Sequence, residues 1–421
     1  MKVFKFGGAS LETIERIQQV GKIIEAHASG KLLVVISAMG KTTNELEKVA
    51  QNYFMRKREI AAQLLYNVEQ QHKDIAAALL GTREHPLFTQ LQQFFTEAEW
   101  TLGEKPHRNY DYYYDQLVGL GELLSTAIVS AYFNQAGIRN TWVDVRDVFR
   151  TDDNFRDANI NWEVTELQVN QKVLPLFNTA NIVIAQGFIG STDQNESVTL
   201  GREGSDFSAA VFANLLNAES QTIWKDVTGL KNADPKLFPN TVDIPEIAYS
   251  EVIEMAYYGA QVIHPKTIKP LQNKQIPLYV KCFLDMHLPG TVIRQDVDGR
   301  KLPPIIVLKK NQVLISITSR DFSFITEDKI SEIYEIFHDK KIKINLTQNA
   351  AITFSCSIDH NPEKIELLIK ALHTGYRINY DEGLELLTVR HYQNGLIEEL
   401  TQNRKILLEQ RNASTIQMVL K

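Results

Sequence analysis

The chain has 421 residues, of which 44% are hydrophobic and 23% are charged, and its formal net charge at pH 7 is -6. This length is typical of two or three domains, and the composition is that of a soluble globular protein. The slight negative charge argues against a broad basic surface, so we expect no nucleic-acid partner.

The two cysteines, Cys282 and Cys356, are far apart and lack the spacing of metal ligands. We therefore expect neither a disulfide framework nor a zinc site, and two free thiols fit a reducing cytoplasm. The chain opens with a strand-like alternation over residues 2–6 rather than with a signal peptide. No window is apolar over the length of a membrane-spanning helix, so we expect no membrane partner.

The N-terminal segment predicts an α/β fold. We expect a strand over residues 3–6, a glycine turn over 7–10, a helix over 12–28 and a strand over 32–37. The last strand is a continuous apolar run, which suits a parallel strand covered on both faces. This βαβ unit predicts a layered, mostly parallel sheet with its ligand site at the carboxyl ends of the strands.

The middle of the chain continues this pattern as far as a polar linker. Residues 44–135 are mainly helical in character. Further strands are expected at 181–185, 222–224 and 277–280. The polar segment 296–301 reads as a linker. We therefore assign residues 1–296 to a first domain and residues 305–421 to a C-terminal region.

The C-terminal region is predicted to contain two small α+β units. The first has the order βαββα, with strands at 313–318, 342–346 and 352–358 and helices at 329–338 and 362–372. A shorter, truncated copy follows, with strands at 384–389, 406–408 and 415–420 and a helix at 396–403. Repeated units of this kind after an α/β domain indicate a ligand-sensing or dimerising tail.

A first glycine turn carries a lysine. Lys5 lies directly before the turn that contains Gly7 and Gly8. Glycines let the backbone approach a phosphate closely, and the helix that follows adds partial positive charge at its N-terminus. The spacing is not that of a Walker A loop. A tight turn with an exposed lysine would give the same pattern.

A second glycine turn precedes a helix in the segment LGREGSDFSAA, residues 200–210. Arg202 offers a planar fork that suits a carboxylate. Ser205 and Asp206 have the residue types that commonly cap a helix N-terminus, and capping does not exclude a further role.

Two more motifs follow. The segments IWKDVTGL and NADPK place three lysines, Lys225, Lys231 and Lys236, after a buried strand. A solvated loop explains each lysine singly, whereas the cluster could contact nucleotide phosphates. The segment YYGAQVIHP contains His264, which we interpret as structural rather than as a catalytic base.

Seven motifs occur in the order found in the aspartate kinases: KFGGAS, SAMGKTTN, GLGELLST, QGFIG, LGREGSDFSAA, IWKDVTGL with NADPK, and YYGAQVIHP. The chain therefore resembles the aspartate kinases, which have the amino-acid kinase fold and C-terminal ACT domains. The resemblance covers nearly all of residues 1–294, and the tail resembles the paired ACT domains of that family.

The resemblance implies a cytoplasmic enzyme that phosphorylates aspartate with ATP, with Mg²⁺ held mainly by the nucleotide and no dedicated metal site. Lys5 would hold the transferring phosphoryl group, and Asp206 would organise that lysine. Aspartate would be bound by Thr43, Glu122, Phe188, Arg202 and Ser205. ATP would be contacted by Lys5, Gly7, Gly8, Ser10, Lys225, Asp226, Lys231, Lys236, Gln261 and Val262. ACT-type units pair in related proteins, which implies a homodimer through the C-terminal region.

The chain departs from the family pattern at several positions. The family usually has glycine where Glu203 stands, threonine at Lys225, tyrosine at Lys231 and lysine at Gln261. The lysine missing at position 261 normally approaches the ATP phosphates. We hypothesise that Lys225 restores this charge.

The tail also departs from the pattern of an effector site. In the related enzymes, lysine or threonine binds at the junction of paired ACT units. This chain has Asp328 where a glycine is favoured, and it has the segment 348–350, QNA, where hydroxyl side chains are usual. We therefore expect weak or absent inhibition by lysine and threonine, with the tail kept mainly for dimerisation.

Three alternative functions can be weighed against an aspartate kinase. Another amino-acid kinase, acting on glutamate or carbamate, would share the same fold. A fusion with homoserine dehydrogenase is not expected, because no dinucleotide-binding domain follows the tail. A decayed kinase that only senses amino acids is opposed by Lys5, Arg202 and Asp206, whereas Gln261 favours it.

Overall fold

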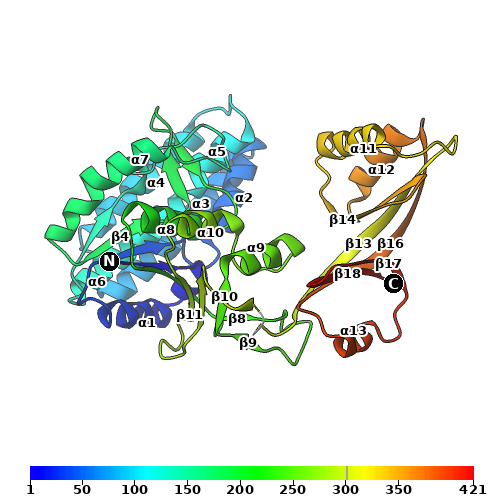
Figure 1. Ribbon diagram of the computed structural model, residues 1–421. Coiled ribbons are helices and arrows are strands. Elements are labelled where there is room, and N and C mark those ends of the chain that lie inside the picture. Colours follow the sequence, from blue (N-terminus) through cyan, green and yellow to red (C-terminus); the bar gives the residue numbers. More distant parts are fainter. Residues whose placement is uncertain (300–301) are drawn as a thin grey trace. The chain divides into compact units, whose positions relative to one another are not determined.

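The computed structural model describes residues 1–299 and 302–421, which form two compact units. The first unit contains residues 1–230, 245–253 and 263–297, and the second contains residues 231–244, 254–262 and 298–421. Two residues of the expected linker, Arg300 and Lys301, lie outside the described residues. Figure 1 labels the elements of both units.

An eight-stranded sheet forms the centre of the first unit, with its strands in the order β10-β12-β11-β7-β1-β2-β4-β3. The strands from β11 to β3 run parallel to their neighbours, whereas β12 is antiparallel to β11. The bounds are β1 Lys2–Phe6, β2 Leu32–Ile36, β3 Asn140–Val143, β4 Ile182–Gln186, β7 Ser220–Lys225, β10 Glu246–Ala248, β11 Leu278–Cys282 and β12 Thr291–Arg294. The expected mostly parallel sheet is confirmed.

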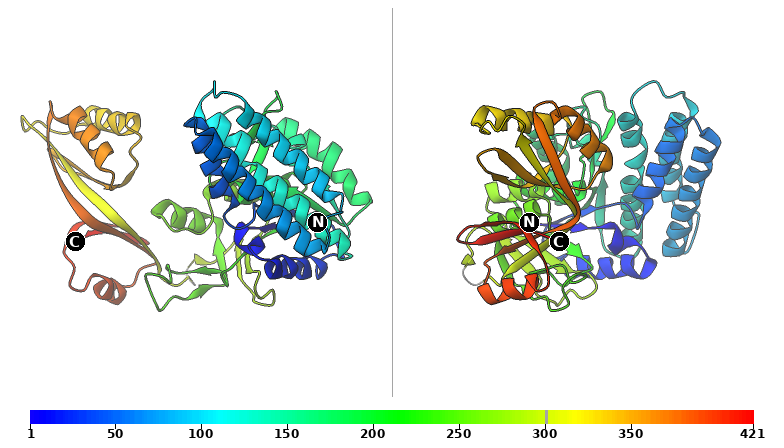
Figure 2. Two further views of the ribbon diagram at one scale, coloured as in Figure 1. Left: turned by 180° about the vertical axis from the view of Figure 1, so that it is seen from behind. Right: turned by 90° about the vertical axis from the view of Figure 1, so that its right-hand side faces the viewer.

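Helices cover this sheet. Every residue of β2 and β4 is buried, as expected for strands covered on both faces. α6 packs on β2, β3 and β4, while α8 packs on β1, β2 and β7. The bounds are α1 Ile14–Glu25, α2 Thr42–Phe54, α3 Arg58–Leu80, α4 Leu87–Gly103, α5 Tyr110–Val118, α6 Leu120–Gln135, α7 Trp162–Gln168, α8 Gly204–Leu215, α9 Tyr249–Tyr258 and α10 Pro265–Asn273. Figure 2 shows the long helices α2 to α6, in blue to cyan, side by side as a bundle.

The most apolar part of this bundle is the helical stretch Tyr110–Gln135, which contains α5 and α6. By length and composition alone it could cross a membrane, so the expectation that no segment meets this test is wrong. However, 83% of its apolar window is buried inside the protein. The stretch is apolar because α6 is surrounded by the sheet and by neighbouring helices, as the core helix of a globular protein is.

A six-stranded antiparallel sheet forms the second unit, in the order β14-β15-β13-β16-β18-β17. Its strands are β13 Ile305–Ser319, β14 Ile344–Asn349, β15 Thr353–Asp359, β16 Tyr376–Arg390, β17 Ile406–Arg411 and β18 Thr415–Leu420. Its helices are α11 Glu327–Asp339, α12 Pro362–Leu372 and α13 Asn394–Thr401. Buried residues of α11 and α12, such as Phe337 and Leu368, share one apolar core with β13 and β15.

The second small repeat, expected to be truncated, gains a strand from the start of β13. β13 and β16 are each 15 residues long, and their pairing shifts register between Lys309 and Gln312. Before the shift, residues 305–309 pair with the part of β16 that also pairs with β18. After it, residues 312–318 pair with β15 as well. One long strand therefore serves both repeats, and its first third supplies the strand that the second repeat lacks in sequence order.

Candidate active site

The carboxyl ends of β1, β2, β4 and β7 meet at one edge of the central sheet, because these strands are parallel neighbours or near neighbours. In open α/β sheets, ligands bind beyond this edge. The turns that follow the strands carry several of the residues singled out in the sequence, among them Gly7, Gly8 and Phe188.

Lys5 and Asp206 form an ion pair at this edge. Their Nζ and Oδ1 atoms are 2.6 Å apart, and the two side chains are only 12% and 4% exposed. Lys5 lies on β1, while Asp206 lies in the first turn of α8, where the helix N-terminus favours a negative side chain. The pair brings together the two glycine turns that the sequence singled out.

Gly8 marks a close approach between the turns after β1 and β2. A Cβ atom at Gly8 would lie 2.8 Å from the carbonyl oxygen of Gly40 and 2.9 Å from that of Ala38. The backbone N–H of Gly40 donates to the carbonyl of Gly8 over 3.0 Å. This close approach requires glycine at position 8, whereas Gly40 has a φ of 50°, a left-handed conformation that favours glycine. Next to it, the Ser10 hydroxyl donates to the carbonyl of Gly7 over 2.6 Å.

Glu122 lies in the first turn of α6 and is 2% exposed. Its Oε1 atom accepts the backbone N–H of Ala38 over 3.2 Å. Its Oε2 atom is buried and has no hydrogen-bond partner within the residues that the structure describes. Burial raises the pKa of Glu122 to about 8, and the N–H of Ala38 and the charge of Lys5 partly oppose this rise. A buried carboxylate oxygen without a partner is a ready acceptor for a substrate cation.

Phe188 and Ser205 lie where β4 and α8 meet. A Cβ atom at Gly187 would lie 2.5 Å from the Cβ atom of Ser205, so the two turns are in direct contact. Phe188 has a φ of 70°, a left-handed conformation that is rare for an aromatic residue. Its backbone N–H donates to the Ser208 hydroxyl over 2.9 Å, which holds this conformation against α8.

The segment before α8 is held by Glu203, at a position where the family usually has glycine. Glu203 is the N-cap residue of α8 and has a φ of 55°. Its Oε2 atom accepts the backbone N–H of His264, over 2.9 Å, and His264 is the N-cap residue of α10. The neighbouring Arg202 is exposed.

The structure places the remaining predicted residues in three groups. Thr43 is half-buried in the first turn of α2, after the turn that contains Gly40. Lys225 ends β7 and Asp226 follows it, exposed. The other predicted ATP contacts belong to the second unit and are Lys231, Lys236, Gln261 and Val262. Within that unit, Nζ of Lys231 pairs with Oδ1 of Asp243 at 2.7 Å.

Several residues that build this site had no predicted role. Ala38 supplies an N–H to Glu122, and Ser208 holds the turn at Phe188. Glu203 was noted only as a departure from the family pattern. His264, interpreted as structural, caps α10 by accepting the N–H of Lys266 over 3.2 Å. A glycine at the end of a buried strand, as at Gly187, is the sequence signal that could have indicated the close approach to Ser205.

No group of three or more His, Cys, Asp or Glu side chains suited to a metal occurs in residues 1–299 or 302–421. The carboxylate at the centre of the site, Asp206, is already paired with Lys5. The donor set therefore fits a magnesium ion that arrives with its phosphate ligands better than a resident metal.

Comparison with known proteins defines the family. Residues 1–282 match the model of the amino acid kinase family. The chain therefore belongs to the amino acid kinase family.

Among curated proteins, the chain is similar to aspartokinase 2, chloroplastic, of Arabidopsis thaliana, with 29% identity over 98% of this chain and 72% of that one. It is also similar to lysine-sensitive aspartokinase 3 of Escherichia coli strain K12, with 28% identity over 92% of this chain and 86% of that one. The resemblance to aspartate kinases is thus confirmed in sequence over most of the chain.

Among solved structures, the chain is similar to E. coli aspartokinase III in complex with lysine and aspartate, with a TM-score of 0.80 and 25% identity. That match covers 100% of this chain and 95% of the other. The same enzyme in complex with aspartate and ADP gives a TM-score of 0.78, again at 25% identity, over 100% of this chain and 96% of the other.

Proposed function

We propose that the protein is an aspartate kinase, which transfers the γ-phosphoryl group of ATP to the side-chain carboxylate of L-aspartate and forms ADP and 4-phospho-L-aspartate. The observation that carries the proposal is the buried carboxylate of Glu122 beside the Lys5–Asp206 ion pair. It provides a site for an ammonium group next to a site for a phosphoryl group. Named aspartokinases are similar over nearly the whole chain, and one of them binds aspartate and ADP.

In this reaction a carboxylate oxygen of aspartate attacks the γ-phosphorus. The bond between that phosphorus and the β,γ-bridging oxygen breaks, and the electron pair leaves with ADP. The acceptor is already ionised at neutral pH, so no strong general base is required. Catalysis then depends on alignment and on neutralising the charge on the phosphoryl oxygens.

The residues divide these tasks. Lys5 holds the transferring phosphoryl group, and Asp206 fixes the position of its ammonium group. Glu122 binds the ammonium group of aspartate, while Arg202 binds a carboxylate of the same substrate through its planar fork. When bound, Mg²⁺ carried by ATP supplies further positive charge at the phosphates.

In this proposal, the other residues singled out in the sequence motifs complete the aspartate and ATP sites. Thr43, Phe188 and Ser205 complete the aspartate pocket in this proposal. The nucleotide is contacted by Gly7, Gly8, Ser10, Lys225, Asp226, Lys231, Lys236, Gln261 and Val262. We further propose cytoplasmic action, a place at the first step of lysine, threonine and methionine synthesis, and a homodimer through the C-terminal region.

An assay that couples ADP release to NADH oxidation tests the proposal. We expect ADP release that requires L-aspartate and a product that hydroxylamine converts to a hydroxamate, as it does other acyl phosphates. Glutamate and carbamate at the same concentration serve as rival acceptors. Release that is faster with either rival, or that is independent of any acceptor, would show a different kinase or a decayed one.

A further inference from the structure

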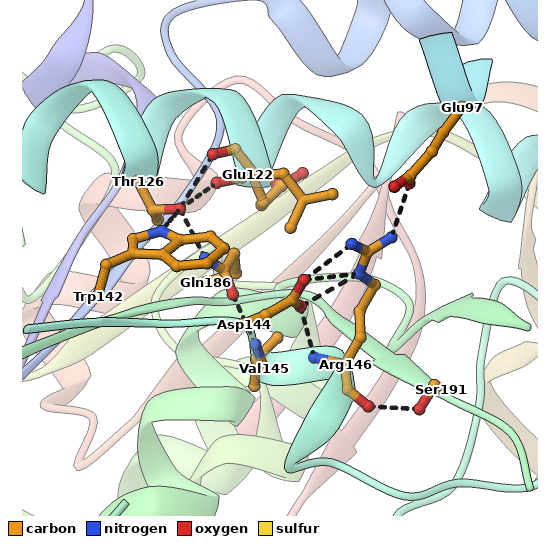
Figure 3. A network of polar contacts seen from close by, with 10 residues as sticks. Glu97, Glu122, Thr126, Trp142, Asp144, Val145, Arg146, Gln186 and Ser191 are labelled. Atoms are coloured by element: carbon orange, nitrogen blue, oxygen red, sulfur yellow. Dashed lines mark hydrogen bonds and ion pairs between the residues drawn. The ribbon is translucent and has the colours of Figure 1, made fainter. Parts of the chain in front are cut away.

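Two fully buried polar side chains meet between α6 and β4, behind the aspartate pocket. Gln186 and Thr126 are both 0% exposed. Nε2 of Gln186 donates to Oγ1 of Thr126 over 2.7 Å, and Oε1 of Gln186 accepts the backbone N–H of Val145 over 2.7 Å. Figure 3 shows Gln186 between Thr126 and Val145. Because a backbone N–H only donates, it fixes which end of the amide faces Thr126.

The Thr126 hydroxyl is fully engaged. It accepts from Gln186 and from Nε1 of Trp142, the latter over 2.9 Å, and it donates to the carbonyl oxygen of Glu122 over 2.8 Å. The carbonyl of Leu123, at 3.2 Å, shares the same donor. A hydroxyl group has one hydrogen and two lone pairs, so no capacity remains and its orientation is fixed.

This hydroxyl connects two walls of the aspartate pocket. One proposed wall is the first turn of α6, where the carbonyl of Glu122 accepts from Thr126 and the Oε2 atom of Glu122 is buried without a hydrogen-bond partner among the described residues. The other is the turn after β4, which begins at Gln186 and continues through Gly187 to Phe188 with its φ of 70°. A strained turn keeps its conformation only when its surroundings hold it.

We propose that Thr126 and Gln186 are positioning residues of the phosphoryl transfer, which together keep the Glu122 turn and the Phe188 turn at the spacing that aligns aspartate. The inference rests on the proposed function and names residues to which that function assigns no substrate contact. Within residues 1–299 and 302–421, no hydrogen bond joins Thr126 or Gln186 to Lys5 or Asp206. ATP binding should therefore not depend on Thr126 or Gln186. A shift of about 1 Å in a bound substrate can cost roughly a hundredfold in rate.

The decisive variants are Thr126→Val, which keeps the shape but removes the hydroxyl, and Thr126→Ser, which keeps the hydroxyl. For Thr126→Val we expect a KM for aspartate raised about tenfold or more and a lower kcat, with the KM for ATP changed less than about threefold. Thr126→Ser should stay within about threefold of the wild type in all three constants, since the hydroxyl is retained.

A purely structural role predicts another pattern. Breaking a buried polar network lowers stability, so the melting temperature is measured for every variant. The proposal is overturned if folded Thr126→Val has a normal KM for aspartate, if both KM values rise equally, or if Thr126→Ser is as impaired as Thr126→Val.

Gln186→Met keeps the test decisive if Thr126→Val does not fold. It preserves the length of the side chain but removes the amide, and with it the donor to Thr126 and the acceptor for Val145. The same selective rise in the KM for aspartate is expected, and a normal KM contradicts the proposal. If the wild type itself shows no aspartate-dependent ADP release, the proposed function fails instead, which is a distinct result.

Discussion

The ammonium group of Lys5 and the carboxylate of Asp206 are 2.6 Å apart, although one residue lies near the end of the first strand of the chain and the other lies in the first turn of α8. Both side chains are nearly buried. Each therefore fixes the position of the other, and neither can be changed without affecting its partner.

We expect Lys5→Met to lower kcat by about a hundredfold or more, because it removes the charge that stabilises the phosphoryl oxygens but keeps the length of the side chain. It should also lower the melting temperature, since Asp206 is left buried without its partner. Lys5→Met combined with Asp206→Asn should recover stability but not turnover. Lys2→Met, at an exposed position of the same strand, is the control. Near-normal turnover of Lys5→Met would contradict the role of Lys5.

The raised pKa of Glu122 predicts that aspartate binding depends on pH. With a pKa of about 8, the free enzyme holds this carboxyl protonated at neutral pH, whereas a bound ammonium group requires it ionised. The KM for aspartate should therefore fall as pH rises from about 6 to about 8, by up to tenfold per pH unit below the pKa. The KM for ATP should change little.

Glu122→Gln tests the assignment of this pH dependence. The amide cannot ionise, so the KM for aspartate should be high and nearly constant over the same range. A KM that still falls with rising pH in Glu122→Gln would assign the titration to another group. The raised pKa of Glu122 also affects the stability of the fold. Because the carboxyl binds a proton more tightly in the folded state, the folded state should become less stable as pH rises from about 4.5 to about 8.

Arg202 is expected to act on aspartate rather than on ATP. A planar, bidentate contact with a carboxylate is poorly replaced by an ammonium group. Arg202→Lys should raise the KM for aspartate about tenfold, the equivalent of roughly one charged hydrogen bond, and leave the KM for ATP nearly unchanged. Arg139→Lys, at an exposed position of the same unit, is the matched control. Equal increases in both KM values would refute the assignment.

Two substitutions of Glu203 can separate the effect of its left-handed backbone from the effect of its side-chain hydrogen bond. Glu203→Gly relieves the left-handed backbone but removes the acceptor for the N–H of His264, whereas Glu203→Gln keeps an acceptor of the same size. Strain relief and the lost hydrogen bond are each about 1 kcal/mol, so the melting temperature of Glu203→Gly should change little. Its KM for aspartate should rise several-fold, because the segment that carries Arg202 loses its anchor.

Hydrogen exchange gives a direct check on this anchor. The His264 amide should exchange faster in Glu203→Gly than in the wild type, and Glu203→Gln should resemble the wild type in both exchange and KM. If Glu203→Gly binds aspartate normally, the contact with His264 has no part in shaping the pocket.

The N-terminal half of the fold could be predicted because its signals are local. The continuous apolar run of β2 and the glycines at Gly7 and Gly8 indicated a βαβ unit, and the structure has one. β3 was missed because it is short and lies at the sheet edge, where three of its four residues are only half-buried. The first third of β13 was missed because it pairs with a strand far along the chain.

The candidate site, too, could be predicted from the sequence only in part. The convergence of Lys5 and Asp206 was expected from two glycine turns at strand ends, but only the first turn follows a strand of the parallel sheet. The turn before α8 follows β6 (Ser197–Thr199), which pairs antiparallel with β5 (Ile189–Ser191) in a separate small sheet. The free Oε2 atom of Glu122 did not follow, because it depends on how α6 packs against the turn after β2. The anchoring role of Glu203 did not follow either, since no local rule places a glutamate in a left-handed conformation.

The tail offers a final prediction about regulation. Asp328 lies in the first turn of α11, where it accepts the hydroxyl of Thr326, so its carboxylate occupies the place where the family favours a bare glycine backbone. Gln348 and Asn349, exposed at the end of β14, stand where hydroxyl groups are usual. An amino-acid effector would lose backbone approach on one side and hydroxyl partners on the other.

We therefore expect lysine and threonine to inhibit weakly or not at all. Each lost hydrogen bond to a charged group costs roughly 1.5–3 kcal/mol, and two such losses weaken binding about a hundredfold or more. The measurement is a titration of each amino acid against aspartate-dependent ADP release at fixed ionic strength, with leucine as the control for added amino acid. Asp328→Gly provides the converse test, since it should increase sensitivity to lysine or threonine if the carboxylate blocks the site. Half-inhibition of the unaltered protein below about 1 mM lysine or threonine would show that the effector site is intact, because such binding equals about 4 kcal/mol or more.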